Sequence, residues 1–345
     1  MAILYARSPY FVSITGVVDD ATNVDLYLWN DPDSVPSNAT YSLDKTILIG
    51  TKNNYDISEY VREYIAHTSF TEVTADTAAT VSEYCWCTVK TYKNTVLQAT
   101  ATFLCLNGYG YHADGKNPVL GVVSAIPPLM TEGTYYVTED GVTGGLFYYD
   151  DQAVTWEAKW TGIGTVTSTT TVTLGEEVGY IPYIHPTYAG TGGNLLLIVR
   201  NSVTVGTYRF EEICEPKYTP IKCDFVNRYG VWQRLMFFKA SRIEMTMMNE
   251  EYNLMPSSLD YDEQDNIRQS FNTNAQESIT CNTGWVVEGY SSVMKELLLS
   301  EKIMLDDKAV KLQTKNVKLM THLNEKVINY EVKFDYSNMM LNNVI

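Results

Sequence analysis

Residues 328–336 follow a two-residue period, and this feature limits the fold more than any other in the sequence. Apolar or aromatic side chains occupy every second position, at Ile328, Tyr330, Val332, Phe334 and Tyr336. Successive side chains of a strand point to opposite faces, so the segment predicts a β-strand with one buried and one solvated face. Ile243, Met245 and Met247 repeat the same period and predict a second strand of this kind.

The residue types along the chain favour strands over helices. The sequence holds 26 Tyr and 6 Trp, and residues 165–173 are a run of Thr, Val and Ser. Aromatic and β-branched side chains suit a pleated, half-buried surface and lose rotamer freedom in a helix. We therefore expect an all-β protein with few helices.

Turn signals divide the chain into three expected domains. Residues 1–126 predict a β-sandwich and residues 127–217 a second one, because short strands recur between Gly, Asp and Pro turns. Residues 218–345 predict a third β domain. The expected linkers are 126–129, with two consecutive prolines, and 215–220.

Two segments have helical spacing. Residues 56–65 place Ile57, Val61 and Ile65 on one face, with Asp56 as an expected N-cap. Residues 291–300 carry an apolar stripe behind two serines and predict one helix packed on the third domain.

The net charge of the chain argues against some classes of binding partner. Lys and Arg total 25 and Asp and Glu total 41, so the formal net charge is −16. Nucleic-acid binding draws most of its affinity from cations, so no specific nucleic acid is expected as a partner. No signal segment and no long apolar run is recognisable. We expect no membrane insertion and synthesis in a cytoplasm.

Residue types that bind metals or catalyse reactions lack the usual spacings. The histidines His67, His112, His185 and His322 form no metal-ligand motif, and no phosphate-binding or nucleophile-elbow motif occurs. Cys85 and Cys87 have one residue between them, which is too close for the usual zinc pair. We expect buried structural cysteines, no catalytic residues, no cofactor and no metal.

An acidic group at residues 260–265 is the one candidate cation site. Asp260, Asp262, Glu263 and Asp265 resemble part of a calcium loop. The central Gly and the terminal bidentate Glu of such a loop are missing. A solvated loop is favoured, and weak calcium binding is the alternative.

Tyrosine pairs near turns are the candidate ligand surfaces. The pairs are Tyr109 with Tyr111, Tyr148 with Tyr149, and Tyr180 with Tyr183. Amphipathic rings suit exposed sugar-binding platforms. Packing inside the sandwiches is the favoured alternative.

Several segments resemble virion proteins of tailed bacteriophages, particularly phages of Bacteroidetes-like hosts. In the third domain these are Cys223–Arg234, Ile279–Glu288, Met294–Glu301 and Leu323–Tyr330, and near the N-terminus Arg7–Phe11 and Tyr55–Arg62. The resemblance implies a tail or baseplate protein whose third domain has a tail-tube or distal-tail fold.

The resemblance also implies a structural role that uses no catalytic residues. The expected role is a structural component of the virion, with copies of itself and other virion proteins as partners. The alternative is a receptor-binding protein that attaches to host-surface glycans through the aromatic loops.

Overall fold

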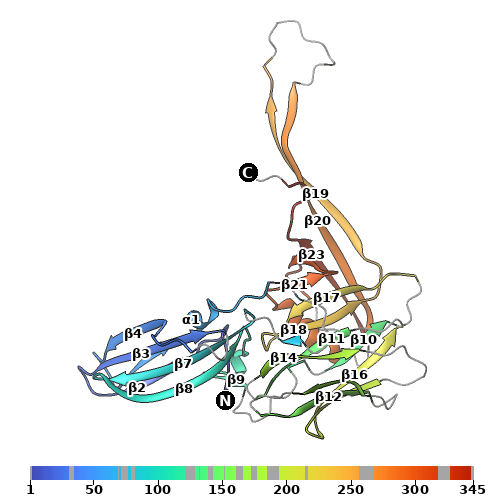
Figure 1. Cartoon of the computed structure of the whole chain (residues 1–345). Helices are drawn as coiled ribbons and strands as arrows, with labels where there is room; N and C mark the ends of the chain where they lie inside the picture. The colour runs from blue at the N-terminus through green and yellow to red at the C-terminus, as the bar shows by residue number, and fades with distance from the viewer. Residues whose placement is uncertain are drawn as a thin grey trace. The chain divides into compact units, whose positions relative to one another are not determined.

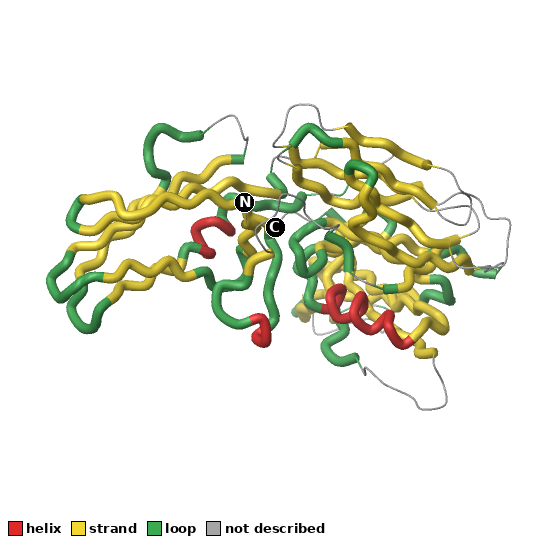
Figure 2. The backbone as a smooth tube through the Cα atoms, turned by 90° about the horizontal axis from the view of Figure 1, so that it is seen from below, coloured by secondary structure: helices red, strands yellow, loops and turns green. Residues whose placement is uncertain are grey.

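The computed structural model confirms the all-β prediction. It describes residues 2–30, 35–68, 70, 77–78, 82–120, 129–131, 133–138, 143–150, 152–160, 166–171, 177–184, 194–213, 217–255, 264, 267–317 and 327–342. Strands hold 60% of the described residues and helices 7%. In Figure 2 the red helical segments are accordingly short, and yellow strands form most of the backbone.

The chain forms two compact units where three consecutive domains were expected. Unit 1 comprises Met1–Cys214, Asp224–Leu235 and Gly289–Glu301, and unit 2 comprises Glu215–Cys223, Met236–Glu288 and Lys302–Ile345. The helix expected in the third domain is present, and it belongs to unit 1. Parts of both expected linkers, residues 126–128 and 215–216, lie outside the described residues.

The N-terminal module of unit 1 is built on a six-stranded sheet and a two-stranded sheet. The larger sheet has the order β4-β3-β7-β8-β1-β9 and the smaller one is β2-β5. Their bounds are β1 Ala2–Tyr5, β2 Phe11–Thr15, β3 Ala21–Trp29, β4 Tyr41–Thr46, β5 Lys52–Asp56, β7 Tyr84–Lys93, β8 Val96–Leu106 and β9 Val119–Leu120. Alternate residues of β3, namely Val24, Leu26 and Leu28, enter a core shared with α1.

The first expected helix is shorter than its apolar spacing suggested. Helix α1 spans Ser58–Arg62, and Ile57 is its N-cap. Asp56 still accepts a hydrogen bond at the start of the helix, because the Ser58 backbone N–H donates to its Oδ1 at 3.1 Å. A one-turn 3-10 helix, η1 (His112–Asp114), follows β8.

Two further sheets belong to unit 1. One has the order β10-β16-β15-β12-β13 and the other β11-β14-β6. Their bounds are β6 Thr77–Ala78, β10 Thr134–Thr138, β11 Thr143–Asp150, β12 Thr155–Trp160, β13 Val166–Thr171, β14 Glu177–Ile184, β15 Asn194–Arg200 and β16 Val203–Ile213. Fully buried Trp156, Trp160 and Phe210 form much of this core. Strand β6 lies in the expected first domain but pairs with β14 of the expected second.

The third segment forms a seven-stranded sheet with the order β18-β17-β21-β22-β23-β20-β19. The bounds are β17 Ile221–Val226, β18 Trp232–Phe237, β19 Arg242–Asn253, β20 Arg268–Val287, β21 Ile303–Leu305, β22 Lys308–Leu312 and β23 Val327–Tyr336. Helix α2 (Ser291–Leu298) follows the 3-10 turn η2 (Glu288–Tyr290). The predicted alternation in β23 is confirmed, because Ile328, Tyr330, Val332 and Phe334 are buried.

Every side chain of β18 is buried, including those of the polar residues Gln233 and Arg234. One strand prediction, for β19, needs correction. Ile243, Met245 and Met247 were expected on a buried face and are exposed instead.

Candidate functional site

Metal-ligating side chains do not gather among the described residues. No group of three or more His, Cys, Asp or Glu that could hold a metal ion occurs there. His67 is buried, and its Nε2–H donates to the Gly230 carbonyl oxygen at 3.0 Å, which is a structural role. His112 is exposed on η1. His185, His322 and the acidic residues Asp260 and Asp265 lie outside the described part of the chain.

The described cysteines are buried thiols, as expected. Cys85, Cys87, Cys105, Cys223 and Cys281 are all free and buried, and Cys214 is not described. Burial raises the pKa of Cys85 above its usual range and that of Cys281 to about 12. These two thiols therefore stay protonated and inert at neutral pH.

A buried polar network lies around Glu296 on α2. The Thr131 hydroxyl donates to Glu296 Oε2 at 2.6 Å, and the Arg228 backbone N–H donates to the same oxygen at 3.2 Å. Gln233 joins the network, since its Oε1 accepts from Asn227 Nδ2 at 2.9 Å and its Nε2 donates to Tyr135 at 3.0 Å. Such a satisfied network stabilises one arrangement of unit 1.

Replacing Glu296 by glutamine is expected to raise the free energy of unfolding near pH 7. Burial raises the pKa of Glu296, and the hydrogen bonds from Thr131 and Arg228 oppose this only in part. The folded state therefore loses stability as the pH rises from about 4.5 through the raised pKa. The glutamine has no such titration, so its advantage should shrink as the pH falls through this range.

Urea unfolding of Glu296→Gln and the native chain over a pH series measures this difference. Glu59→Gln, which changes an exposed carboxylate on α1, is the control. Lower stability of the Glu296 variant at every pH would mean that the charged hydrogen bonds outweigh the burial cost.

Most of the candidate sugar-binding rings lie in the core. Tyr109, Tyr148, Tyr149, Tyr180 and Tyr183 are all buried, so they cannot present a face to a glycan. Tyr180 instead donates its hydroxyl to Glu83 Oε2 at 2.9 Å. The structure supports the packing alternative for these five residues.

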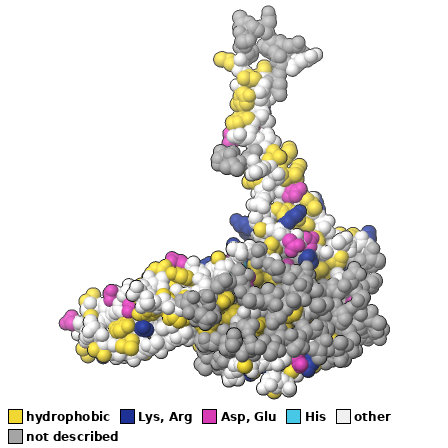
Figure 3. All heavy atoms as spheres, viewed as in Figure 1, with side chains coloured by type: hydrophobic (Ala, Val, Ile, Leu, Met, Phe, Trp, Pro, Cys, Tyr) yellow, Lys and Arg dark blue, Asp and Glu magenta, His cyan; other side chains and the backbone are white. Residues whose placement is uncertain are grey.

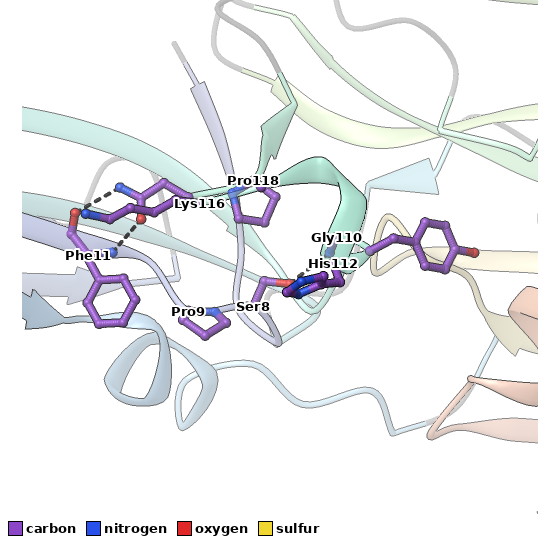
Figure 4. Close-up of a pocket in the computed structure, with 10 residues that line it drawn as sticks. Ser8, Pro9, Phe11, Gly110, His112, Lys116 and Pro118 are labelled. Atoms are coloured by element: carbon purple, nitrogen blue, oxygen red, sulfur yellow. Dashed lines mark hydrogen bonds between the residues drawn. The ribbon is translucent and has the colours of Figure 1, made fainter.

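A cavity of about 480 Å³ lies beside the remaining tyrosine, Tyr111. Figure 4 shows Phe11, His112, Lys116 and Pro118 around it. The backbone here is held firmly, because the Phe11 N–H donates to Asn117 Oδ1 at 2.8 Å and Asn117 Nδ2 donates to the Phe11 oxygen at 2.9 Å.

The Tyr111 ring already has cationic neighbours. Lys295 Nζ lies 4.1 Å from its centroid and the Arg228 guanidinium carbon 5.0 Å. Phe11 has one, since Lys116 Nζ lies 5.5 Å from its centroid. A concave site with aromatic walls and a few polar groups suits a small amphipathic ligand.

The most conspicuous apolar surface lies on unit 2. Strands β19 and β20 run on together beyond the rest of their sheet (Figure 1), and we call residues 242–253 with 268–280 the arm. Ile243, Met245 and Met247 are 61%, 55% and 68% exposed. Figure 3 shows hydrophobic side chains along this part of the molecule.

The apolar face of the arm continues the core face of unit 2. Ile243 lies opposite Ile279, which lies opposite Phe334 on the next strand. Residues opposite one another share a face of the sheet. Ile279 and Phe334 are buried, whereas Ile243 is exposed at the sheet edge.

A second apolar surface lies at one end of the N-terminal module. Three loops meet there, because Asp19 N–H donates to the Ile47 oxygen at 2.8 Å and Asn94 Nδ2 donates to Asp20 Oδ1 at 2.8 Å. Their exposed aliphatic residues are Val17, Val18, Leu48, Ile49, Val96 and Leu97.

Two comparisons with known proteins found no match. No protein-family model matches the chain, and no curated protein matches it. Within the described residues, no helix is both long and apolar enough to cross a membrane. The function is therefore inferred from the geometry of the chain itself.

Sequence reasoning missed both exposed apolar surfaces. The arm has a recognisable sequence signal, the period-two stripe of Ile243, Met245 and Met247, but the stripe was assigned to a buried face. The loop end has no such signal, because Val17, Val18, Leu48 and Ile49 come from two turns and Val96 and Leu97 from the start of β8, and only the sheet pairing brings them together.

Proposed function

We propose that the chain is a structural component of a bacteriophage tail or baseplate. In this role the C-terminal β domain assembles with copies of itself and other virion proteins, and the N-terminal modules are peripheral contact modules. The observation that carries the proposal is the arm, a strand pair with an exposed apolar face. Contiguous exposed apolar surfaces commonly mark protein interfaces.

The resemblance of Cys223–Arg234 and Ile279–Glu288 to tailed-phage virion proteins supports the same role. The net charge of −16 also agrees with it, since an acidic surface does not retain a passing nucleic acid. Host attachment and a virion location follow from the proposal.

Mass spectrometry of purified phage particles tests the role directly. Peptides of the chain in intact particles, together with rings or tubes in negative-stain images of the isolated protein, would support it. Absence from particles of a phage that encodes the chain would reject it.

The cavity beside Phe11 favours a second candidate, a receptor-binding protein for host-surface glycans. Aromatic and polar side chains of the cavity suit the two faces of a sugar ring. Retention on a glycan array, lost in Phe11→Ala and kept in Phe271→Ala, would support it. Phe271 is an exposed ring of the arm and serves as the matched control. No retention by the native chain would reject this candidate.

A further inference from the structure

Strand β19 is the edge strand of its sheet, and the part of it before the bulge at Met248 and Glu250 contains neither Lys nor Pro. The C-terminal segment covers the other side of the arm, because the Met340 N–H donates to the Ala275 oxygen of β20 at 2.9 Å. In the described part of the chain no strand lies beyond β19. Natural edge strands commonly carry Lys, Pro or a bulge against pairing. The segment Arg242–Met248 contains none of these.

Within the described residues, no layer covers the apolar face of the arm. Ile243, Met245 and Met247 are each more than half exposed on one face of β19. A two-stranded hairpin is only marginally stable alone in water, and further strands or a covering layer stabilise it. A partner strand at the outer edge of β19 would supply such an addition.

We propose that β19 pairs antiparallel with β19 of a second copy of this chain, with Met245 opposite Met245. The bulge between Met248 and Glu250 ends the regular segment, which begins at Arg242. Met245 is the midpoint of this segment, so the proposed register gives the longest uninterrupted ladder. A seven-residue ladder spans about 23 Å.

The hydrogen-bonding pattern restricts the register further. In an antiparallel pair, residues whose backbone groups point outward must face each other. Facing positions of two identical strands are therefore both odd or both even. Every allowed register thus keeps the stripe of Ile243, Met245 and Met247 on one continuous face across both copies.

The side chains are self-complementary in the proposed register. Ile243 faces Met247 of the second copy, which places apolar beside apolar. Glu244 faces Thr246, and Arg242 faces Met248, so no two like charges are opposed. Like charges directly opposite each other would destabilise the pair, and their absence favours a second copy over an unrelated strand.

The proposed pairing gives the structural role a specific contact, and it rests on the proposed function only for its biological purpose. The pairing and the structural role can be rejected independently. A protein that pairs in solution but is missing from phage particles rejects the role and keeps the pairing. A protein found in particles that stays monomeric and forms no link at position 245 rejects the pairing and keeps the role.

Two cysteine variants of the full chain test the register. Met245→Cys should form a disulfide between copies under mild oxidation, because facing Cα atoms lie about 4.5–5.5 Å apart. Thr246→Cys should not, since the two copies of residue 246 face residue 244 and lie beyond the reach of a disulfide. Peptide mass spectrometry locates the link. Equal or preferential linking of Thr246→Cys would overturn the register.

A pair of lysine variants tests the contact itself by light scattering over a concentration series. Met245→Lys with Met247→Lys should weaken pairing by about 100-fold, because it removes the apolar side chains that face Met245 and Ile243 of the second copy and places two lysines opposite each other at position 245. Val96→Lys with Leu97→Lys makes the same change on exposed residues of unit 1 and should leave pairing intact. A monomeric native chain, or equal loss of pairing in both variants, would overturn the proposal.

Discussion

Gly230→Ala is expected to destabilise the protein by about 3–5 kcal/mol, although it adds only one methyl group. Gly230 has φ +85°, in the region that favours glycine, and a Cβ there would lie 2.4 Å from the Gly108 nitrogen and 2.5 Å from the Asn107 carbonyl carbon. Both neighbours are backbone atoms and cannot rotate away. Two turns of unit 1 would have to separate, which would break the 2.7 Å hydrogen bond from Tyr109 N–H to the Arg228 oxygen.

Gly50→Ala is the matched control. Gly50 has φ +87°, yet nothing lies within 4 Å of a Cβ built there. The loss of stability in Gly50→Ala therefore measures the backbone cost alone, which is about 1 kcal/mol. Chemical denaturation of both variants measures the difference. Similar losses for the two would show that the turns at 107–109 and 228–230 are not in close contact.

Arg234→Met should destabilise unit 1 by about 3–5 kcal/mol. Arg234 and Asp224 are each 3% exposed, and the guanidinium donates to both carboxylate oxygens, at 2.7 Å from Nε and 3.0 Å from Nη2. The substitution leaves a buried carboxylate without its cation. Desolvation of that charge accounts for most of the expected loss.

The double variant Asp224→Leu with Arg234→Met decides between a lost charge partner and lost packing. Removing both charges should recover most of the stability, because two apolar side chains of similar size replace the pair. Equilibrium unfolding of the native chain and both variants gives the comparison. A double variant as unstable as Arg234→Met alone would show that packing around residue 234 dominates.

The two-residue period predicted a buried face correctly where the strand lies inside its sheet, and wrongly where the strand lies at the edge. In β23 the period of two coincides with a core face, so Ile328 and Phe334 are buried as expected. In β19 the same period is present, but its apolar face extends beyond the sheet that should cover it. The two-residue period shows that one face of a strand is apolar, but it does not show which residues, if any, pack against that face.

Long-range pairing could not be predicted from the sequence either. Strand β10 pairs in parallel with β16, and β1 pairs in parallel with β8. Neither pair is joined by a hairpin, so no turn signal marks it. Arg234 and Asp224 lie on the neighbouring strands β18 and β17, and their pairing could be found only from the fold.

Only one residue of the candidate site could be predicted from the sequence. Tyr111 was selected for its position near a turn and does line the cavity. Phe11, His112 and Lys116 meet it through a fold that brings residues 8–11 beside 110–118. No local pattern encodes that contact.

The interleaving of the two units has a consequence for how the chain matures during synthesis. Unit 1 needs Asp224–Leu235 and Gly289–Glu301, which the ribosome releases after the sheets of residues 1–213 are already made. Glu296 therefore reaches Thr131 only late in synthesis, and until then the sheets of residues 1–213 lack two segments of their unit. A fragment that stops near residue 217 should therefore be prone to aggregation. Refolding experiments need both late segments of unit 1 to be present.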